Sequence, residues 1–210
     1  PLSELLSLYV LVSGATPPEV VEAVLEAGCR MIQFREKHLP LPAQVEAAGR
    51  VREACRRHAA LLLINDPGDL ALAVGADGVH LGQDDLPVAA ARRILGPAAI
   101  IGATCETAEE ARIAQAAGAD YIGAGPVYAT PSKADAGEPY GPAVVRRVSG
   151  ATHLPVVGIG GIGIGGAAPV IEAGGVGVAV ISSVVGAPDP VAAARAILDE
   201  VEGAKRGVLA

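Results

Sequence analysis

Residues 99–125 read AIIGATCETAEEARIAQAAGADYIGAG and predict one complete strand–helix–strand unit. The apolar runs at 99–104 and 120–125 are short and continuous, as is typical of strands buried on both faces of a parallel sheet. Between them, Thr107 with acidic residues in the following turn predicts a helix start. Gly118, directly after the expected last turn, suits the left-handed position that ends many helices. The segment therefore predicts one repeat of an α/β fold.

The same pattern recurs along the whole chain of 210 residues. An open, doubly wound sheet seldom needs eight regular units, whereas a closed barrel does. We therefore expect one domain, residues 1–210, with the α/β fold class and a single (β/α)8 TIM barrel. Strands are expected at 8–13, 30–35, 61–65, 77–82, 99–104, 120–125, 155–160 and 176–182, each followed by a helix, at 17–27, 42–58, 68–74, 87–95, 107–117, 141–149, 164–173 and 189–204.

Composition excludes several classes of protein. The formal charge is −7 without a basic cluster, which argues against nucleic-acid partners and an anionic membrane surface. The uncharged segment 154–171 is too broken by glycine and proline to be a membrane span. The N-terminal stretch lacks a basic region and contains Glu4, so we expect no signal peptide. The 3 cysteines have no metal-like spacing, and we expect a reducing, cytoplasmic location.

Polar side chains interrupt the second expected strand. Because side chains alternate along a strand, Gln33, Arg35 and Lys37 share one face, while Ile32 and Phe34 face the helices. The polar set then points inward at the mouth of the barrel, where a cation is costly unless a negative ligand meets it. The alternative is a solvated strand end that trails into a loop.

Acidic residues follow the next two strands. Asn65 and Asp66 end the third strand, and Asp84 and Asp85 follow the fourth. Carboxylates at neighbouring strand ends can converge on Mg²⁺, which prefers a few carboxylates together with waters and substrate phosphates. The alternative is helix N-capping, for which Asp66 and Asp84 are both placed. Together with the inward cations, the acids favour a site for pyrophosphate and Mg²⁺.

The last two expected strands end in glycine-rich segments, 156–166 and 175–183. Exposed backbone N–H groups at these two loops of a barrel commonly bind phosphate. Residues 158–163 also match the dinucleotide-binding pattern, but no acid lies about 20 residues further on to hold a ribose. The alternative for the glycines is close packing of helix on strand.

The longest expected loop, residues 126–141, follows the sixth strand and has the position of a mobile lid. It carries Thr130, Ser132 and Lys133, and Lys133 is placed to swing over a bound phosphate. An ordinary solvated lysine is the alternative. We interpret Cys105 as a buried, inert thiol and His80 as a core histidine in preference to a catalytic base.

Six segments cover nearly the whole chain: QFREK at 33–37, NDPGDLAL at 65–72, GVHLGQDDLP at 78–87, GAGPVYATPSK at 123–133, VVGIGGI at 156–162 and GVAVIS at 177–182. In this order they resemble the thiamine-phosphate synthase family. That resemblance implies coupling of 4-amino-2-methyl-5-hydroxymethylpyrimidine diphosphate to a thiazole phosphate, which yields thiamine phosphate and pyrophosphate.

The resemblance also implies roles for individual residues. Asp66 and Asp85 match the family's Mg²⁺ ligands, and we expect Arg35, Lys133 and Thr104 to be catalytic. Positions matching the pyrimidine diphosphate site are Gln33, Arg35, Lys37, Asn65 and Lys133, and those matching the thiazole phosphate site are Thr130, Ser132, Gly161, Ile181 and Ser182. We also expect Thr104 to bind substrate.

The sequence departs from the family after the fifth strand. The family usually has Ser and then His there, whereas this chain has Thr104 and Glu106. Thr104 keeps a hydroxyl near the reacting carbon. A related branch, the thiazole tautomerases, typically lacks the full acid pair, so Asp66 and Asp85 favour the synthase. A non-catalytic ligand-binding relative is the third hypothesis, and a homodimer is compatible with the sequence.

Overall fold

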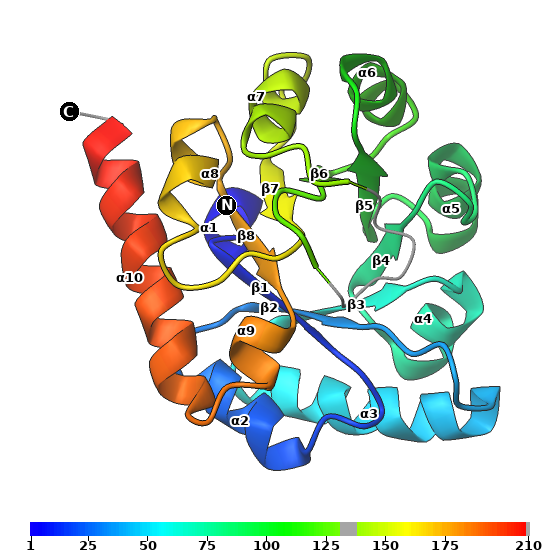
Figure 1. Cartoon of the computed structure of the whole chain (residues 1–210). Coiled ribbons are helices and arrows are strands. Elements are labelled where there is room, and N and C mark those ends of the chain that lie inside the picture. The colour runs from blue at the N-terminus through cyan, green and yellow to red at the C-terminus, as the bar shows by residue number, and fades with distance from the viewer. Residues whose placement is uncertain (131–137, 209–210) are drawn as a thin grey trace.

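Eight parallel strands close into a barrel in the computed structural model, which describes residues 1–130 and 138–208. Neighbours along the chain pair in order, and β1 closes the barrel against β8 through the register Leu8 to Val178. Figure 1 shows the helices as a ring outside these strands, which confirms the predicted TIM barrel. The strands are β1 (Leu8–Val12), β2 (Met31–Phe34), β3 (Leu61–Asn65), β4 (Gly78–Leu81), β5 (Ile100–Cys105), β6 (Tyr121–Ala124), β7 (Val156–Ile159) and β8 (Gly177–Val180).

The helices lie where the sequence predicts them, with differences near the last two strands. Two short helices, α1 and α9, are not predicted, and the eighth strand ends at Val180, before the expected Ser182. Helix α8 starts later than expected because Gly163 and Gly166 form a turn, with the Gly166 N–H donating to the Gly163 carbonyl. The helices are α1 (Leu2–Leu5), α2 (Pro18–Glu26), α3 (Leu41–Arg57), α4 (Gly68–Val74), α5 (Val88–Leu95), α6 (Ala108–Ala116), α7 (Ala143–Ser149), α8 (Ala168–Glu172), α9 (Ser182–Val185) and α10 (Pro190–Val208).

The helix termini confirm the signals in the sequence. The Thr107 hydroxyl accepts from the Glu110 N–H, and the Glu110 carboxylate accepts from the Thr107 N–H, which is a complete capping box. At the other end of α6, Gly118 has a φ of 93°, a conformation that favours glycine. These local interactions define the unit from which the barrel repeats.

Two apolar layers follow from the alternation of side chains along the strands. Ile32 and Phe34 belong to the large core between strands and helices, whereas Met31 lies in the smaller core inside the barrel. The buried Gln33 shares the inward direction of Met31 because it is two residues further along β2. This confirms that the polar residue of β2 points into the barrel.

The cysteines and helices bear on the expectations drawn from composition. Cys29, Cys55 and Cys105 are all free and buried. Burial raises the pKa of the Cys105 thiol to about 12, so it stays a protonated thiol, as the sequence suggested. In the described part of the chain, no helix combines the length and apolar character needed to cross a bilayer.

Candidate active site at the carboxyl end of the barrel

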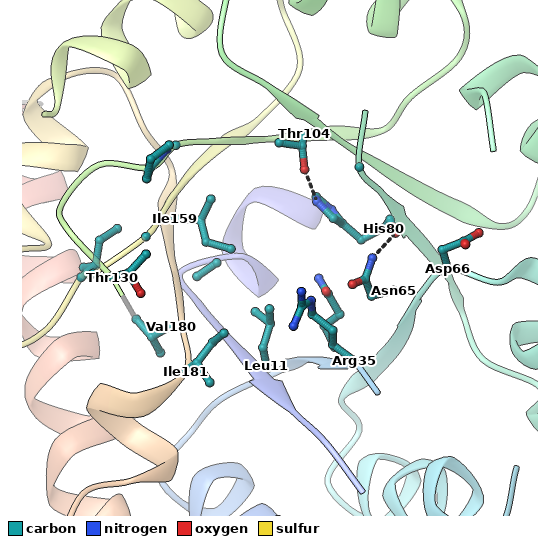
Figure 2. A pocket seen from close by; sticks show the side chains of 18 of the residues that line it. Leu11, Arg35, Asn65, Asp66, His80, Thr104, Thr130, Ile159, Val180 and Ile181 are labelled. Atoms are coloured by element: carbon teal, nitrogen blue, oxygen red, sulfur yellow. Dashed lines mark hydrogen bonds between the residues drawn. The ribbon is translucent and has the colours of Figure 1, made fainter. Parts of the chain in front are cut away.

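A cavity of about 360 Å³ opens where the strands end, which is the face of a TIM barrel that carries active sites. It collects side chains from most of the strands and from the loops after them (Figure 2). Its lining residues are Leu11, Gln33, Arg35, Glu36, Lys37, Asn65, Asp66, His80, Gly82, Gln83, Asp84, Asp85, Thr104, Glu106, Gly125, Pro126, Thr130, Ile159, Gly160, Gly161, Ile162, Ala179, Val180, Ile181, Ser182 and Ser183.

The predicted cations lie on the β2 side of this cavity. Figure 2 shows the Arg35 guanidinium pointing into the pocket beside Asn65. Lys37 lines the same pocket from the exposed loop after β2. Within residues 1–130 and 138–208, neither Arg35 nor Lys37 forms an ion pair with a carboxylate. The side chains therefore leave positive charge for an anionic ligand.

Glu36 fixes the loop that carries these cations, although it is not among the site residues predicted from the sequence. Its Oε1 accepts from the His38 N–H at 2.7 Å, and its Oε2 accepts from the Gly14 N–H at 3.0 Å. Burial opposes ionisation, but these backbone N–H groups outweigh it and lower the pKa of Glu36. The carboxylate thus ties the loop after β2 to the loop after β1. An acid between two cations was the only signal for it in the sequence.

Asp66 and Asp84, the two acids placed for helix capping, do not cap helices, and neither does Asp85. Helix α4 follows Pro67 and helix α5 follows Pro87, and neither of these N-cap prolines makes a side-chain hydrogen bond to its helix. Instead, Asp85 Oδ2 accepts from the Gly82 N–H at 2.6 Å. Burial, and then the negative charge of Asp85, raise the pKa of Asp66. The two carboxylates therefore lie near enough to interact, at the margin of the pocket where Figure 2 places Asp66.

The donor set at this margin fits Mg²⁺. The described residues contain no group of three or more His, Cys, Asp or Glu side chains that would form a cage for a metal ion. Magnesium needs no such cage, because it keeps several waters and binds through one or two carboxylates plus substrate phosphates. Asp66 and Asp85 meet that description, beside an Arg35 that pairs with no carboxylate of the described residues.

The opposite side of the pocket is built from backbone. Gly161 and Ser182 line it, and their N–H groups donate to no acceptor among the described residues. Gly161 has a φ of 64°, and a Cβ there would fall 2.4 Å from the Ala129 carbonyl oxygen, so only glycine fits. Figure 2 shows Thr130 and Ile181 on this side, across the pocket from Asp66.

Glu200 on α10 supports the glycine-rich loop from behind. Its Oε1 accepts from the N–H groups of Ala167 and Ala168 at 2.9 and 2.8 Å, and its Oε2 accepts from the Gly165 N–H at 2.8 Å. The sequence reasoning missed Glu200, which lies more than thirty residues from the loop. No pattern of residues close together in the sequence predicts such a contact.

His80 and Thr104 meet at the floor of the pocket. The His80 Nε2 and the Thr104 Oγ1 lie 3.0 Å apart, and the His80 Nδ1 lies 2.7 Å from the Tyr121 hydroxyl. His80 is buried and hydrogen-bonded, as expected of a core histidine, but it also lines the pocket. Tyr121 is not among the site residues predicted from the sequence.

A family model described as thiamine monophosphate synthase matches residues 8–184. The chain belongs to this family. A thiamine biosynthesis bifunctional protein of Symbiobacterium thermophilum is 82% identical over all 210 residues, which make up 44% of that protein. A thiamine-phosphate synthase of Moorella thermoacetica is 47% identical over 94% of this chain and 97% of its own length. Among solved structures, a thiamine phosphate pyrophosphorylase from Pyrococcus furiosus has a TM-score of 0.89 at 39% identity, covering 97% of this chain and 99% of its own.

These comparisons confirm the resemblance seen in the sequence. The chain is a thiamine-phosphate synthase, a transferase, on a TIM barrel. It spans less than half of the bifunctional relative, so that protein's second activity is not carried over.

Two of the site residues expected from the thiamine-phosphate synthase pattern, Ser132 and Lys133, lie outside the described residues. All of the other expected residues line the one cavity. Glu106, where this chain departs from the family, also lines it and accepts from the Tyr140 hydroxyl at 2.8 Å. Glu106 thereby contacts the described end of the loop at 126–141.

Proposed function

We propose that this cavity binds an aminopyrimidine methyl diphosphate beside a thiazole phosphate and joins them into thiamine phosphate, with release of pyrophosphate. One observation carries the proposal. Among the residues that the structure describes, cations without an ion-pair partner and two carboxylates lie on one side of the pocket, and backbone N–H groups without acceptors lie on the other. The pocket is therefore suited to two anionic groups, one bound by cations and a metal ion and the other bound by backbone N–H groups.

The diphosphate belongs on the cationic side. Arg35 and Lys37 would bind its oxygens there, together with Lys133 from the loop at 126–141. Asp66 and Asp85 would hold Mg²⁺, which when bound supplies further positive charge to the diphosphate. Because these groups face the leaving group, they stabilise it most as its negative charge grows. Gln33 and Asn65 would bind the pyrimidine part of the same substrate.

The thiazole phosphate belongs on the opposite side. Backbone N–H groups of Gly161, Ile181 and Ser182 would bind its phosphate, with the hydroxyls of Thr130 and Ser132 beside them. Anchoring the phosphate there directs the thiazole ring toward the pyrimidine. This arrangement makes the reaction of two substrates effectively intramolecular.

The reaction breaks the C–O bond between the pyrimidine methylene and the diphosphate. The electron pair leaves with pyrophosphate, and the resulting cation is stabilised by the amino group of the pyrimidine ring. The thiazole nitrogen then donates its lone pair and forms the new C–N bond. No side-chain nucleophile or strong general base is required. The Thr104 hydroxyl would lie near the reacting carbon and help to position the pyrimidine.

A coupled assay with both substrates, with and without Mg²⁺, tests the proposal. We expect pyrophosphate and thiamine phosphate in equal amounts, and only with Mg²⁺. Binding of the pyrimidine diphosphate with no pyrophosphate released over hours would instead indicate a ligand-binding relative. A thiazole tautomerase would turn over without Mg²⁺ or pyrimidine, and Asp66→Ala would leave its rate nearly unchanged. Loss of coupling by several orders of magnitude in Asp66→Ala excludes that alternative.

A further inference from the structure

A continuous chain of hydrogen bonds crosses the barrel beneath the pocket. It runs from Gln33 on β2 to Thr104 on β5, and both ends line the pocket. Gln33 Nε2 donates to the Tyr9 hydroxyl at 2.5 Å, and the Tyr9 and Tyr121 hydroxyls lie 2.8 Å apart. The Tyr121 hydroxyl lies 2.7 Å from His80 Nδ1. His80 Nε2 lies 3.0 Å from Thr104 Oγ1, the hydrogen bond that Figure 2 marks between these two residues.

The fold makes room for this chain. Gly102 and Gly123 face the barrel interior, and a Cβ at Gly102 would fall 2.1 Å from the Tyr121 ring. A Cβ at Gly123 would come within 3.2 Å of the His80 ring. Tyr9 and Tyr121 lie in an interior layer that is otherwise apolar, so the two phenols must find their partners within this set of hydrogen bonds. Burial raises the pKa of both Tyr9 and Tyr121, and each phenol therefore keeps its hydrogen.

The hydrogen bonds have one direction. The NH₂ group of the Gln33 amide can only donate, so the Tyr9 hydroxyl accepts from it and donates its own hydrogen to the Tyr121 hydroxyl. Tyr121, having accepted from Tyr9, donates to His80 Nδ1. A neutral His80 then carries its hydrogen on Nε2 and donates it to Thr104. If the Gln33 amide were rotated by 180°, its carbonyl would accept from the Tyr9 hydroxyl. Donor and acceptor would then be exchanged in every hydrogen bond from Tyr9 to Thr104.

We propose that Tyr9, Tyr121 and His80 are positioning residues that hold the Gln33 carbonyl as a hydrogen-bond acceptor, and the Thr104 hydroxyl as a donor, toward the pocket. This proposal rests on the proposed function, because it concerns how the pyrimidine is recognised. The amino group of an aminopyrimidine is a hydrogen-bond donor, which complements the Gln33 carbonyl. An analogue with a carbonyl in place of the amino group presents an acceptor to the Gln33 carbonyl and is rejected.

The histidine tautomer tests the direction without any activity measurement. A long-range ¹H–¹⁵N spectrum of the protein at neutral pH, with His80 assigned by its loss in His80→Gln, reports which ring nitrogen carries the hydrogen. We expect the neutral Nε2–H form in the wild type. In Tyr121→Phe, where Nδ1 loses its donor, we expect the His80 resonances to shift. A wild-type His80 that is cationic, or protonated on Nδ1, overturns the proposal.

Substrate discrimination tests the consequence at the other end. Tyr9→Phe frees the Gln33 amide to rotate, so we expect the preference for the amino over the oxo pyrimidine diphosphate to fall about tenfold, as the loss of one hydrogen bond to a fixed partner would cause. The KM for the thiazole phosphate should stay the same. Tyr128→Phe is the matched control, because Tyr128 donates to the Gly166 carbonyl outside the chain. It should leave the preference unchanged.

The outcomes separate this proposal from the proposed function. A wild type that does not couple the substrates disproves the function, while the His80 tautomer still supports or overturns the hydrogen-bond direction. A coupling wild type whose preference for the amino substrate survives in folded Tyr9→Phe overturns the positioning role alone. If Tyr9→Phe does not fold, the wild-type tautomer decides.

Discussion

Gly102 on β5 lies against the ring of Tyr121 on β6, so close that a Cβ at Gly102 would fall 2.1 Å from the ring carbon Cζ. The same glycine is in register with His80 on β4. Tyr121 therefore occupies space that a larger residue at position 102 would fill. The missing side chain allows Tyr121 to reach both Tyr9 and His80 inside the barrel.

Gly102→Ala is expected to destabilise the protein. Tyr121 is fully buried and packs edge-on against Tyr9, so its ring has no free space to move into. Overpacking of this kind costs about 1–3 kcal/mol in the free energy of unfolding, measured by urea denaturation. Gly49→Ala in α3 is the control, because no atom lies within 4 Å of its added Cβ. It should stabilise the helix by up to about 1 kcal/mol, and equal effects of the two changes would contradict the prediction.

Arg35→Ala is expected to lower kcat/KM by about 100-fold, the loss typical of removing one group that stabilises developing negative charge. The free energy of unfolding should hardly change, because no ion pair joins Arg35 to a described residue. Arg93→Ala on the exposed side of α5 removes the same charge far from the pocket and should leave kcat/KM unchanged. Steady-state kinetics and urea denaturation of both variants check the prediction, and a large loss of stability in Arg35→Ala would contradict it.

Asp85→Asn is expected to raise the Mg²⁺ concentration needed for half-maximal activity more than about tenfold, equivalent to about 1.4 kcal/mol. Asparagine can still accept from the Gly82 N–H, so the change removes charge while keeping that hydrogen bond. Asp84→Asn removes the same charge from the neighbouring position and should have a much smaller effect. Mg²⁺ titrations of the activity compare the two, and similar shifts would rule out a specific role for Asp85.

Glu200→Gln is expected to raise the KM for the thiazole phosphate and leave the KM for the pyrimidine diphosphate unchanged. The carboxylate accepts N–H groups at both oxygens, whereas a glutamine amide turns an NH₂ group toward one of them. The loop that carries Gly161 then loses part of its support. Asp199→Asn, at the exposed neighbouring position, is the control. An equal rise in both KM values would point to a general loss of structure instead.

Glu36→Gln is expected to lower the stability at pH 7 by about 1–2 kcal/mol, because charged acceptors form stronger hydrogen bonds. The folded-state pKa of Glu36 lies below its ordinary value of 4.5, so its contribution is present above that pH and is lost as the pH falls through the lowered pKa. The difference between variant and wild type should therefore shrink in acid. Urea denaturation at pH 7 and below pH 4 measures it, with the exposed Glu46→Gln as the control. A difference in the free energy of unfolding that grows as the pH falls would contradict the prediction.

The repeating unit and the direction of the side chains along each strand can be predicted from the sequence alone. Alternation along β2 decided that Gln33 points inward while Ile32 and Phe34 face the helices. The Thr107 capping box and Gly118 decided where α6 begins and ends. These features depend on residues only a few positions apart, so period and capping chemistry suffice to predict them.

Which of the inward-facing residues contact one another depends on the three-dimensional fold. Tyr9 and Tyr121 are 112 positions apart, and they touch because the barrel closes with a particular register between its strands. Glu200 reaches the loop after β7 because α10 packs beside α8. Such contacts follow from how far each strand is shifted against its neighbour, and that shift is set by packing around the whole barrel. A local pattern of residues does not encode it.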